Sequence, residues 1–192
     1  MKKPSSAALV LPLEGHRRRI WYCVAMSLDG FIAGPKGEYD WIPIEPEIDW
    51  GAFMGRFDTV LMGRRSYEAA LAAPGGGAMP GMRTYVFSRT RRSAADPGIT
   101  IVGDDAATIL ASLRQAPGKD IWLFGGGDLF RSLLQLGEVD MIEVGLVPVL
   151  IGRGIPFLPG LDRVARLRLT ETRRYPTGIT LLTYEVAKDA TS

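Results

Sequence analysis

Short apolar runs that are rich in β-branched and aromatic residues recur along the first two thirds of the chain, and helical patterns separate several of them. This alternation of strands and helices is typical of α/β proteins, in which successive strands pair in parallel. The predicted strands cover residues 20–25, 59–62, 84–87, 99–102 and 121–124. We therefore predict a parallel sheet with flanking helices.

The last third of the chain has a different pattern. Residues 141–150 form one long predicted strand, and residues 167–174 and 179–186 form two more around the turn sequence Tyr175-Pro176-Thr177-Gly178. A hairpin is therefore expected to close the sheet. Two of the predicted helices cover residues 64–72 and a stretch that begins at Asp104 or Asp105 and ends near residue 116.

Composition limits the possible functions. The chain has 192 residues, 46% of them hydrophobic, which suits one domain with a sizeable core. Lysine and arginine number 23 against 21 acidic residues, so the net charge of +2 gives no general reason to expect a nucleic-acid or acidic membrane partner. No stretch approaches the roughly 20 apolar residues of a membrane span. We therefore expect a soluble, cytoplasmic protein.

The chain has one cysteine and one histidine, which excludes sites that need several of these residues. The single cysteine, Cys23, lies in an apolar run and is expected to be a small buried side chain in a reducing compartment. The single histidine, His16, leaves no material for a histidine-based triad or a multi-histidine metal site. No metal centre is therefore predicted.

The N-terminal residues 1–18 are predicted to be a flexible extension, and residues 19–188 the folded domain. Lys2 and Lys3 precede a short apolar run, but Pro12, Glu14 and a run of three arginines interrupt it, unlike the core of a signal peptide.

Three consecutive glycines, Gly125, Gly126 and Gly127, stand between the apolar run 121–124 and an amphipathic run that begins at Asp128. As strand, glycine turn and helix, this order places free backbone N–H groups at a helix N-terminus, where a phosphate is favoured. The alternative is that the glycines only allow a sharp turn.

Two other strand ends carry groups that bind anions. Gly63, Arg64 and Ser66 follow the second predicted strand, and Ser88 and Arg89 follow the third. Ligands of open α/β sheets bind outside the carboxyl ends of the strands, so these signals describe one crevice, long enough for a dinucleotide. Each turn taken alone is equally compatible with an ordinary helix start or surface turn.

The segment between the first two strands supplies candidates for the substrate side. Residues 26–41 form a long loop with apolar side chains, which is expected to fold over a planar ligand as a lid or else to remain a mobile surface loop. Residues 45–56 are predicted to form a helix in which Glu47 lies near one apolar face. Glu47 could hold or protonate a heterocycle there. Asp49 competes for that role, and a solvated acid of the first turn is the alternative.

These stretches together resemble the dihydrofolate reductase superfamily, particularly its branch that includes the reductase domain of bacterial riboflavin biosynthesis. They appear in the family's order over residues 20–186. The matching stretches are Ser27-Leu28-Asp29-Gly30-Phe31-Ile32-Ala33, Val60-Leu61-Met62-Gly63-Arg64, Val86-Phe87-Ser88, Leu123-Phe124-Gly125-Gly126-Gly127, and Gly137-Glu138-Val139-Asp140-Met141 continuing to Pro148, Leu150, Gly152 and Gly154.

The resemblance implies a single-domain, three-layer α/β fold with a mainly parallel central sheet and a C-terminal antiparallel hairpin, and a cis peptide bond between Gly125 and Gly126. It also implies hydride transfer from NADPH to a small heterocyclic or carbonyl substrate, either riboflavin-precursor-like or pterin-like. The residues that it assigns to the cofactor are Ala25 and Ile32 beside the nicotinamide, Gly63, Arg64 and Ser66 at phosphate, Arg64 and Arg89 at the adenosine 2′-phosphate, and Gly125, Gly126, Gly127, Asp128 and Leu129 at the pyrophosphate.

The acidic group on the substrate side stays open between three residues. In folate-reducing members the pterin-binding acid precedes the methionine of Met-Gly-Arg by fifteen residues, which here is Glu47. The riboflavin-type branch does not require that acid, so Asp29, Glu47 and Asp49 are all candidates.

Two other functions compete with a reductase. A non-catalytic nucleotide-binding or sensing protein could use the same fold, since folds host more than one function. A homodimer is the third reading, because the apolar strand 141–150 is compatible with a sheet-edge interface as well as with a buried core strand.

Overall fold

The chain folds into ten strands and four helices within the residues that the computed structural model describes, which are 17–72, 79–90 and 98–188. Residues 1–16 of the predicted extension therefore lie outside the described residues. The strands are β1 (Ile20–Ser27), β2 (Phe31–Ala33), β3 (Phe57–Gly63), β4 (Arg83–Phe87), β5 (Ile99–Val102), β6 (Asp120–Gly125), β7 (Met141–Val147), β8 (Ile155–Pro156), β9 (Leu167–Arg174) and β10 (Thr180–Val186). The helices are α1 (Trp50–Gly55), α2 (Arg64–Ala72), α3 (Ala106–Gln115) and α4 (Gly127–Gln135).

Eight of these strands form one sheet in the order β5-β4-β3-β6-β1-β7-β10-β9. The pairs from β5 to β7 are parallel, whereas β10 is antiparallel to both β7 and β9. A parallel strand with helices over both faces must be apolar almost throughout, and β3 illustrates this with four consecutive buried residues, 59–62. The predicted parallel sheet with a closing hairpin is confirmed.

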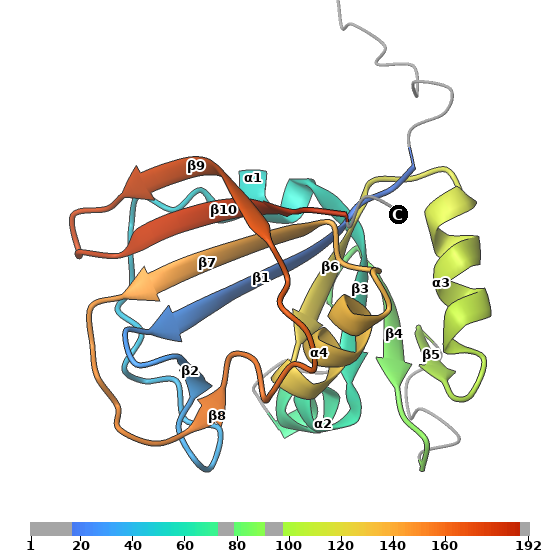
Figure 1. Cartoon of the computed structure of the whole chain (residues 1–192), viewed down its shortest axis with the longest axis horizontal. Helices are drawn as coiled ribbons and strands as arrows, with labels where there is room; N and C mark the ends of the chain where they lie inside the picture. The colour runs from blue at the N-terminus through green and yellow to red at the C-terminus, as the bar shows by residue number, and fades with distance from the viewer. Residues whose placement is uncertain (1–16, 73–78, 91–97, 189–192) are drawn as a thin grey trace, which may run out of the picture.

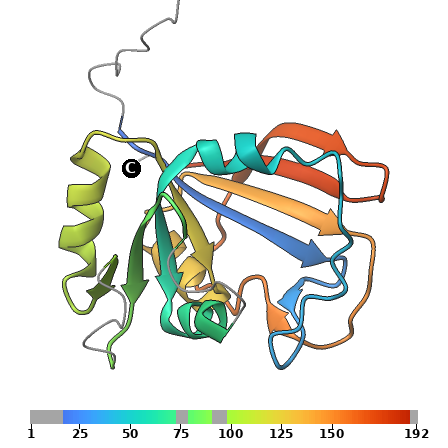
Figure 2. The ribbon, with the colours of Figure 1, turned by 180° about the vertical axis from the view of Figure 1, so that it is seen from behind.

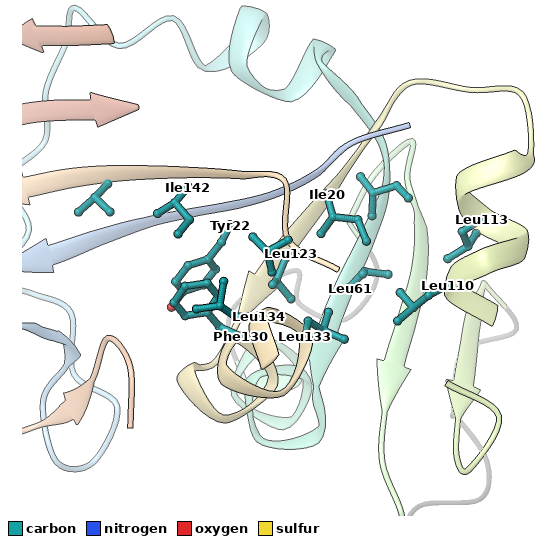
Figure 3. Close-up of a cluster of buried hydrophobic side chains, with 13 residues drawn as sticks. Ile20, Tyr22, Leu61, Leu110, Leu113, Leu123, Phe130, Leu133, Leu134 and Ile142 are labelled. Atoms are coloured by element: carbon teal, nitrogen blue, oxygen red, sulfur yellow. The ribbon is translucent and has the colours of Figure 1, made fainter. Parts of the chain in front are cut away.

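Helices cover both faces of the sheet (Figures 1 and 2). On one face, α3 and α4 pack on a cluster in which Tyr22 stacks on Phe130 with ring centroids 3.9 Å apart (Figure 3). On the other face, Phe53 of α1 and Tyr67 of α2 pack on a second cluster that includes Trp122. This arrangement of helices, sheet and helices is the predicted three-layer α/β fold.

Two predicted elements differ from the structure. The helix expected over residues 45–56 begins only at Trp50, because the Asp49 carboxylate accepts a hydrogen bond from the Ala52 amide at 2.8 Å and caps α1 there. The strand expected over 141–150 ends at Val147, before Pro148. That strand, β7, lies between β1 and β10, so of the two readings of residues 141–150 the buried core strand is confirmed, and a homodimer stays a prediction.

A small second sheet joins the loop after β1 to the loop after β7. β2 pairs antiparallel with β8, with Phe31 opposite Pro156, and the Phe157 amide donates to the Gly30 carbonyl at 2.9 Å. The first part of the expected lid, residues 26–41, is therefore tied to the rest of the fold by backbone pairing.

The first described residues are fastened to the fold by a buried arginine. Arg18 is 1% exposed, pairs with Asp58, and donates to the Thr59 hydroxyl at 2.8 Å and to the Leu113 carbonyl at 3.2 Å. Burial lowers the pKa of Arg18, and the charge of Asp58 opposes that shift. Arg18, which the sequence placed at the end of the extension, therefore belongs to the folded structure.

A second buried arginine closes the same end of the sheet. Arg114, at the end of α3, donates to Glu138 Oε2 at 2.7 Å and to Asp140 Oδ2 at 2.6 Å. It also donates to the Arg18 carbonyl at 3.0 Å. Asp140 Oδ2 in turn accepts from the Ile20 amide at 2.8 Å, so Arg114 and Asp140 join α3 to the start of β1.

Candidate functional site

A large cavity runs along the carboxyl ends of the strands and over the sheet beside α1. Its volume is about 1910 Å³. Pockets for a single small ligand commonly measure roughly 300–1,000 Å³, so this cavity is larger than one such ligand requires. The described residues that line it come from each of the ten strands, from all four helices and from the loops between them.

Two glycine turns meet at one end of the cavity. Gly63 ends β3 directly before α2, and the cis Gly125–Gly126 bond lies directly before α4, which confirms the expected cis peptide. A Cβ atom added at Gly63 would lie 3.6 Å from the Gly125 carbonyl oxygen, and one added at Gly126 would lie 3.5 Å from Ser66 Oγ. The N-termini of α2 and α4 therefore open side by side onto the same space, where the helix dipoles favour an anion.

The residues that the sequence assigned to the cofactor are brought together along this cavity. Gly125 does not line it. Those that line it are Ala25, Ile32, Gly63, Arg64, Ser66, Ser88, Arg89, Gly126, Gly127, Asp128 and Leu129. Arg64 is paired with Glu68 one helical turn away, with Nη1 at 2.9 and 3.0 Å from the two carboxylate oxygens. That these residues bind a cofactor stays a prediction. The prediction requires them to line one cavity, as they do.

Asp29, a candidate on the substrate side, has a structural role. Its carboxylate accepts hydrogen bonds from Ser27 Oγ at 2.7 Å, from the Gly152 amide at 2.7 Å and from the Ile151 amide at 3.2 Å. The bond from Ser27 is the main cause of its lowered pKa, and the Gly152 amide adds to the shift. Asp29 does not line the cavity and instead joins the end of β1 to the turn after β7.

Replacement of Asp29 by asparagine is expected to lower the melting temperature at pH 7 and to weaken its dependence on acid pH. Because the folded state lowers the pKa of Asp29, the stabilisation is present above the ordinary carboxyl pKa of about 4 and is lost as the pH falls below it. Thermal melts between pH 3 and 7 measure this. The exposed Asp104→Asn is the control, and an equal effect of both changes would contradict the role of Asp29.

Glu47 and Asp49 occupy a turn before α1 rather than one helical face. Glu47 is exposed and does not line the cavity, and its amide donates to Glu45 Oε1 at 2.9 Å. Asp49 lines the cavity while it caps α1. Of the three acidic candidates, Asp49 alone therefore borders the space in which a substrate would bind.

Glu45, which the sequence analysis did not select, holds this turn in place. It is 4% exposed and accepts from the hydroxyl of Thr177, at 2.6 Å, and from its amide, at 3.2 Å. The pKa of Glu45 is lowered chiefly by the Thr177 hydroxyl, then by the Glu47 amide and, less, by the charge of Arg173. The β9–β10 hairpin is thereby joined to the segment before α1.

An ion pair between a half-buried arginine and a buried carboxylate forms part of the cavity wall between α1 and the sheet. Arg56 donates to both oxygens of Glu143, at 2.9 and 2.7 Å, and its guanidinium lies 4.7–5.0 Å from the centroids of three aromatic rings. Cys23 is buried beside this pair, and burial is the main reason why the pKa of its thiol is raised well above its ordinary value. The predicted buried cysteine is thus confirmed. The signal that could have revealed Glu143 is a lone charge within the apolar run 141–147.

The chain matches the RibD C-terminal domain family over residues 18–181. The chain belongs to the RibD C-terminal domain family. It is 31% identical to the Bacillus subtilis protein YyaP over 184 residues, which cover 88% of this chain and 95% of YyaP. This is the branch of the superfamily that the sequence resembles.

Solved structures share the fold. A Shewanella sp. PV-4 protein whose name refers to riboflavin biosynthesis has a TM-score of 0.77 and 23% identity, with 88% of this chain and 99% of that chain covered. A dihydrofolate reductase from Enterococcus faecalis, solved in complex with NADP(H), has a TM-score of 0.63 and 18% identity, with 88% of this chain and 97% of that chain covered. Both likenesses support the dihydrofolate-reductase-like architecture of this RibD C-terminal family member.

Within the described residues, no group of three or more histidine, cysteine, aspartate or glutamate side chains is arranged to hold a metal ion. No helix in those ranges is both long and apolar enough to cross a membrane.

Proposed function

We propose that this RibD C-terminal family protein is an NADPH-dependent reductase that transfers a hydride to a small heterocyclic or carbonyl substrate. The observation that carries the proposal is the meeting of two helix N-termini, at Gly63 and Gly126, on a cavity lined by arginines. An adenine dinucleotide phosphate requires cationic contacts at separate phosphate groups, and this end of the cavity offers them.

The residues present fit this cofactor. At the turns before α2 and α4, the lack of a side chain on Gly63 and Gly126 leaves space in which backbone N–H groups can approach a pyrophosphate, and Ser66 Oγ lies beside it. Arg64 and Arg89 are the candidates for the adenosine 2′-phosphate. When bound, NADPH supplies the hydride, and a proton completes the reduction of a C=N or C=O group.

The substrate side of the proposed site contributes orientation and shelter from water. Phe53, Trp122 and Phe124 line the cavity between α1 and the sheet, and Asp49 borders the same space. Aromatic walls favour a planar ligand, since rings stack on or pack edge to face with it. Asp49 is our candidate for a group that holds a polar atom of the substrate or relays a proton to it.

Titration with NADPH is expected to quench the tryptophan fluorescence in a saturable manner, because Trp50 and Trp122 line the cavity. No change up to millimolar NADPH would overturn the proposal. Oxidation of NADPH is then measured with dihydrofolate, with the ribosylaminopyrimidine phosphate of riboflavin biosynthesis and with a panel of heterocycles and carbonyl compounds. Tight binding without turnover on any of them would favour a nucleotide-binding or sensing protein instead.

Arg89→Gln is expected to weaken NADPH binding about tenfold while the affinity for NADH stays within about twofold. A charged hydrogen bond contributes roughly 1.5–3 kcal/mol, and NADH lacks the 2′-phosphate that would receive it. The fluorescence titration measures both affinities. Arg166→Gln, at an exposed arginine that does not line the cavity, is the matched control. Equal losses for both cofactors would remove Arg89 from the 2′-phosphate site.

A further inference from the structure

The charged side chains along the cavity are divided by sign. Around the N-termini of α2 and α4, the described lining residues carry four guanidinium groups and one carboxylate, from Arg64, Arg65, Arg89, Arg131 and Asp128. Between α1 and the β9–β10 hairpin, those residues carry four carboxylates and two guanidinium groups, from Glu45, Asp49, Glu143, Glu171, Arg56 and Arg173. An anion is thus attracted to the first region and repelled by the second, since charges in a cleft focus its field.

Of the two arginines of the second region, Arg56 is paired with a carboxylate and Arg173 lies against an aromatic ring. Arg56 is bonded to both oxygens of Glu143, a carboxylate that is 7% exposed, and lies against three aromatic rings. Arg173 lies 4.8 Å from the ring centroid of Tyr175, and it shares its side of β9 with Glu171. A substrate phosphate would have to displace Glu143 from Arg56, which costs more than a contact with an unpaired cation returns, and beside Arg173 it would also meet the charge of Glu171.

The remaining wall of the second region is apolar. Its lining includes Ile48, Phe53, Trp122, Val147, Ile179 and Leu181. Three of these side chains are firmly placed, because Phe53 and Trp122 pack edge to face with centroids 5.2 Å apart and Val147 is 1% exposed. A charged group that moves from water to such a surface loses hydration without a replacement, whereas a flat uncharged ring gains contact.

We propose that the substrate of this protein is an uncharged, planar aromatic or heteroaromatic compound without a phosphate or carboxylate group. This inference rests on the proposed reductase function, because it assigns the second region to the substrate once the first is assigned to the cofactor. It separates this chain from enzymes whose substrate is a sugar phosphate. The anionic part of the ternary complex is then the cofactor alone.

Matched pairs of probes test the inference. Quinoxaline is compared with quinoxaline-2-carboxylate, and riboflavin with riboflavin 5′-phosphate, by equilibrium dialysis against the protein, alone and saturated with NADP⁺. In at least one pair, the uncharged member is expected to bind at least about tenfold more tightly than the anionic member. In the other pair, the uncharged member is expected to bind no more weakly than the anionic member. Equal or tighter binding of the anionic members would overturn the inference, and so would the absence of binding by every probe at millimolar concentration. Failure of the protein to bind NADP⁺ is scored separately, because it contradicts the proposed function instead.

A charge reversal on β9 provides a second test. Glu171→Arg is expected to tighten the binding of riboflavin 5′-phosphate about fivefold and to leave that of riboflavin within about twofold, since one unit charge near a surface contributes up to about 1 kcal/mol. Thr172→Arg is the control, because this neighbouring residue is exposed and does not line the cavity. No gain from Glu171→Arg, or the same gain from both variants, would show that the local charge of the second region does not select the substrate.

Discussion

Replacement of Arg114 by methionine is expected to lower the free energy of unfolding by about 3–5 kcal/mol. The Arg114 side chain is 3% exposed, and its loss leaves Asp140, 12% exposed, without its main cationic partner. The buried carbonyl of Arg18 loses a hydrogen bond as well. The charge left unpaired, rather than the attraction lost, accounts for most of this effect. Equilibrium unfolding in urea measures it.

Arg17→Met is the matched control for Arg114. Arg17 forms an ion pair at 3.6 Å with Glu138, which is also a partner of Arg114, but the Arg17 side chain is 56% exposed. Exposed pairs contribute about 0–1 kcal/mol, so this variant is expected to change the free energy of unfolding by no more than that. A loss for Arg114→Met as small as that for Arg17→Met would mean that water replaces the buried contacts without penalty.

Gly127→Ala is expected to lower the free energy of unfolding by about 1–3 kcal/mol and to weaken NADPH binding. An added Cβ would lie 2.7 Å from the Pro156 carbonyl oxygen and 2.9 Å from Pro159 Cδ. Backbone and ring atoms cannot rotate away, so α4 or the segment after β8 must move. The higher helix propensity of alanine, about 1 kcal/mol, offsets part of the cost.

Gly63→Ala is the control for the effect of Gly127→Ala on stability. Its added Cβ would meet the Gly125 carbonyl oxygen at 3.6 Å, an ordinary contact distance, although Gly63 also precedes a helix that lines the cavity. Thermal melts of the two variants should therefore differ clearly, with Gly127→Ala the less stable. Similar melting temperatures would show that the chain segment 156–159 adapts to the extra methyl group.

The elements that sequence predicted best are those whose local signals agree. α2 spans residues 64–72, β5 spans 99–102 and β9 spans 167–174, all with the predicted boundaries. In each case a glycine, proline or polar cluster ends a clear periodic run. β2 and β8 were missed because strands of three and two residues carry no periodic pattern, and their pairing joins positions far apart in the chain.

The residues proposed for the substrate side were predicted less well than the glycine turns, for a physical reason. A glycine turn before a helix can bind phosphate through its own backbone, so the sequence near Gly63 and Gly126 defines the geometry of the turn almost completely. Glu45 and Arg56 are instead defined by Thr177, in the turn between β9 and β10, and by Glu143 on β7. Such contacts exist only after folding, so spacing within residues 45–56 favoured the exposed Glu47.

Because β2 pairs with β8, the backbone at Pro156 contacts two distant parts of the cavity wall. Pro156 faces Phe31, the neighbour of Ile32, across the small sheet, while its carbonyl oxygen lies against Gly127 at the start of α4. The segment at Pro156 therefore contacts both the nicotinamide end and the pyrophosphate end of the proposed site. Insertions or deletions between residues 148 and 160 should consequently change the distance between the two ends of the proposed cofactor site, whereas changes of the same size in a surface turn should not.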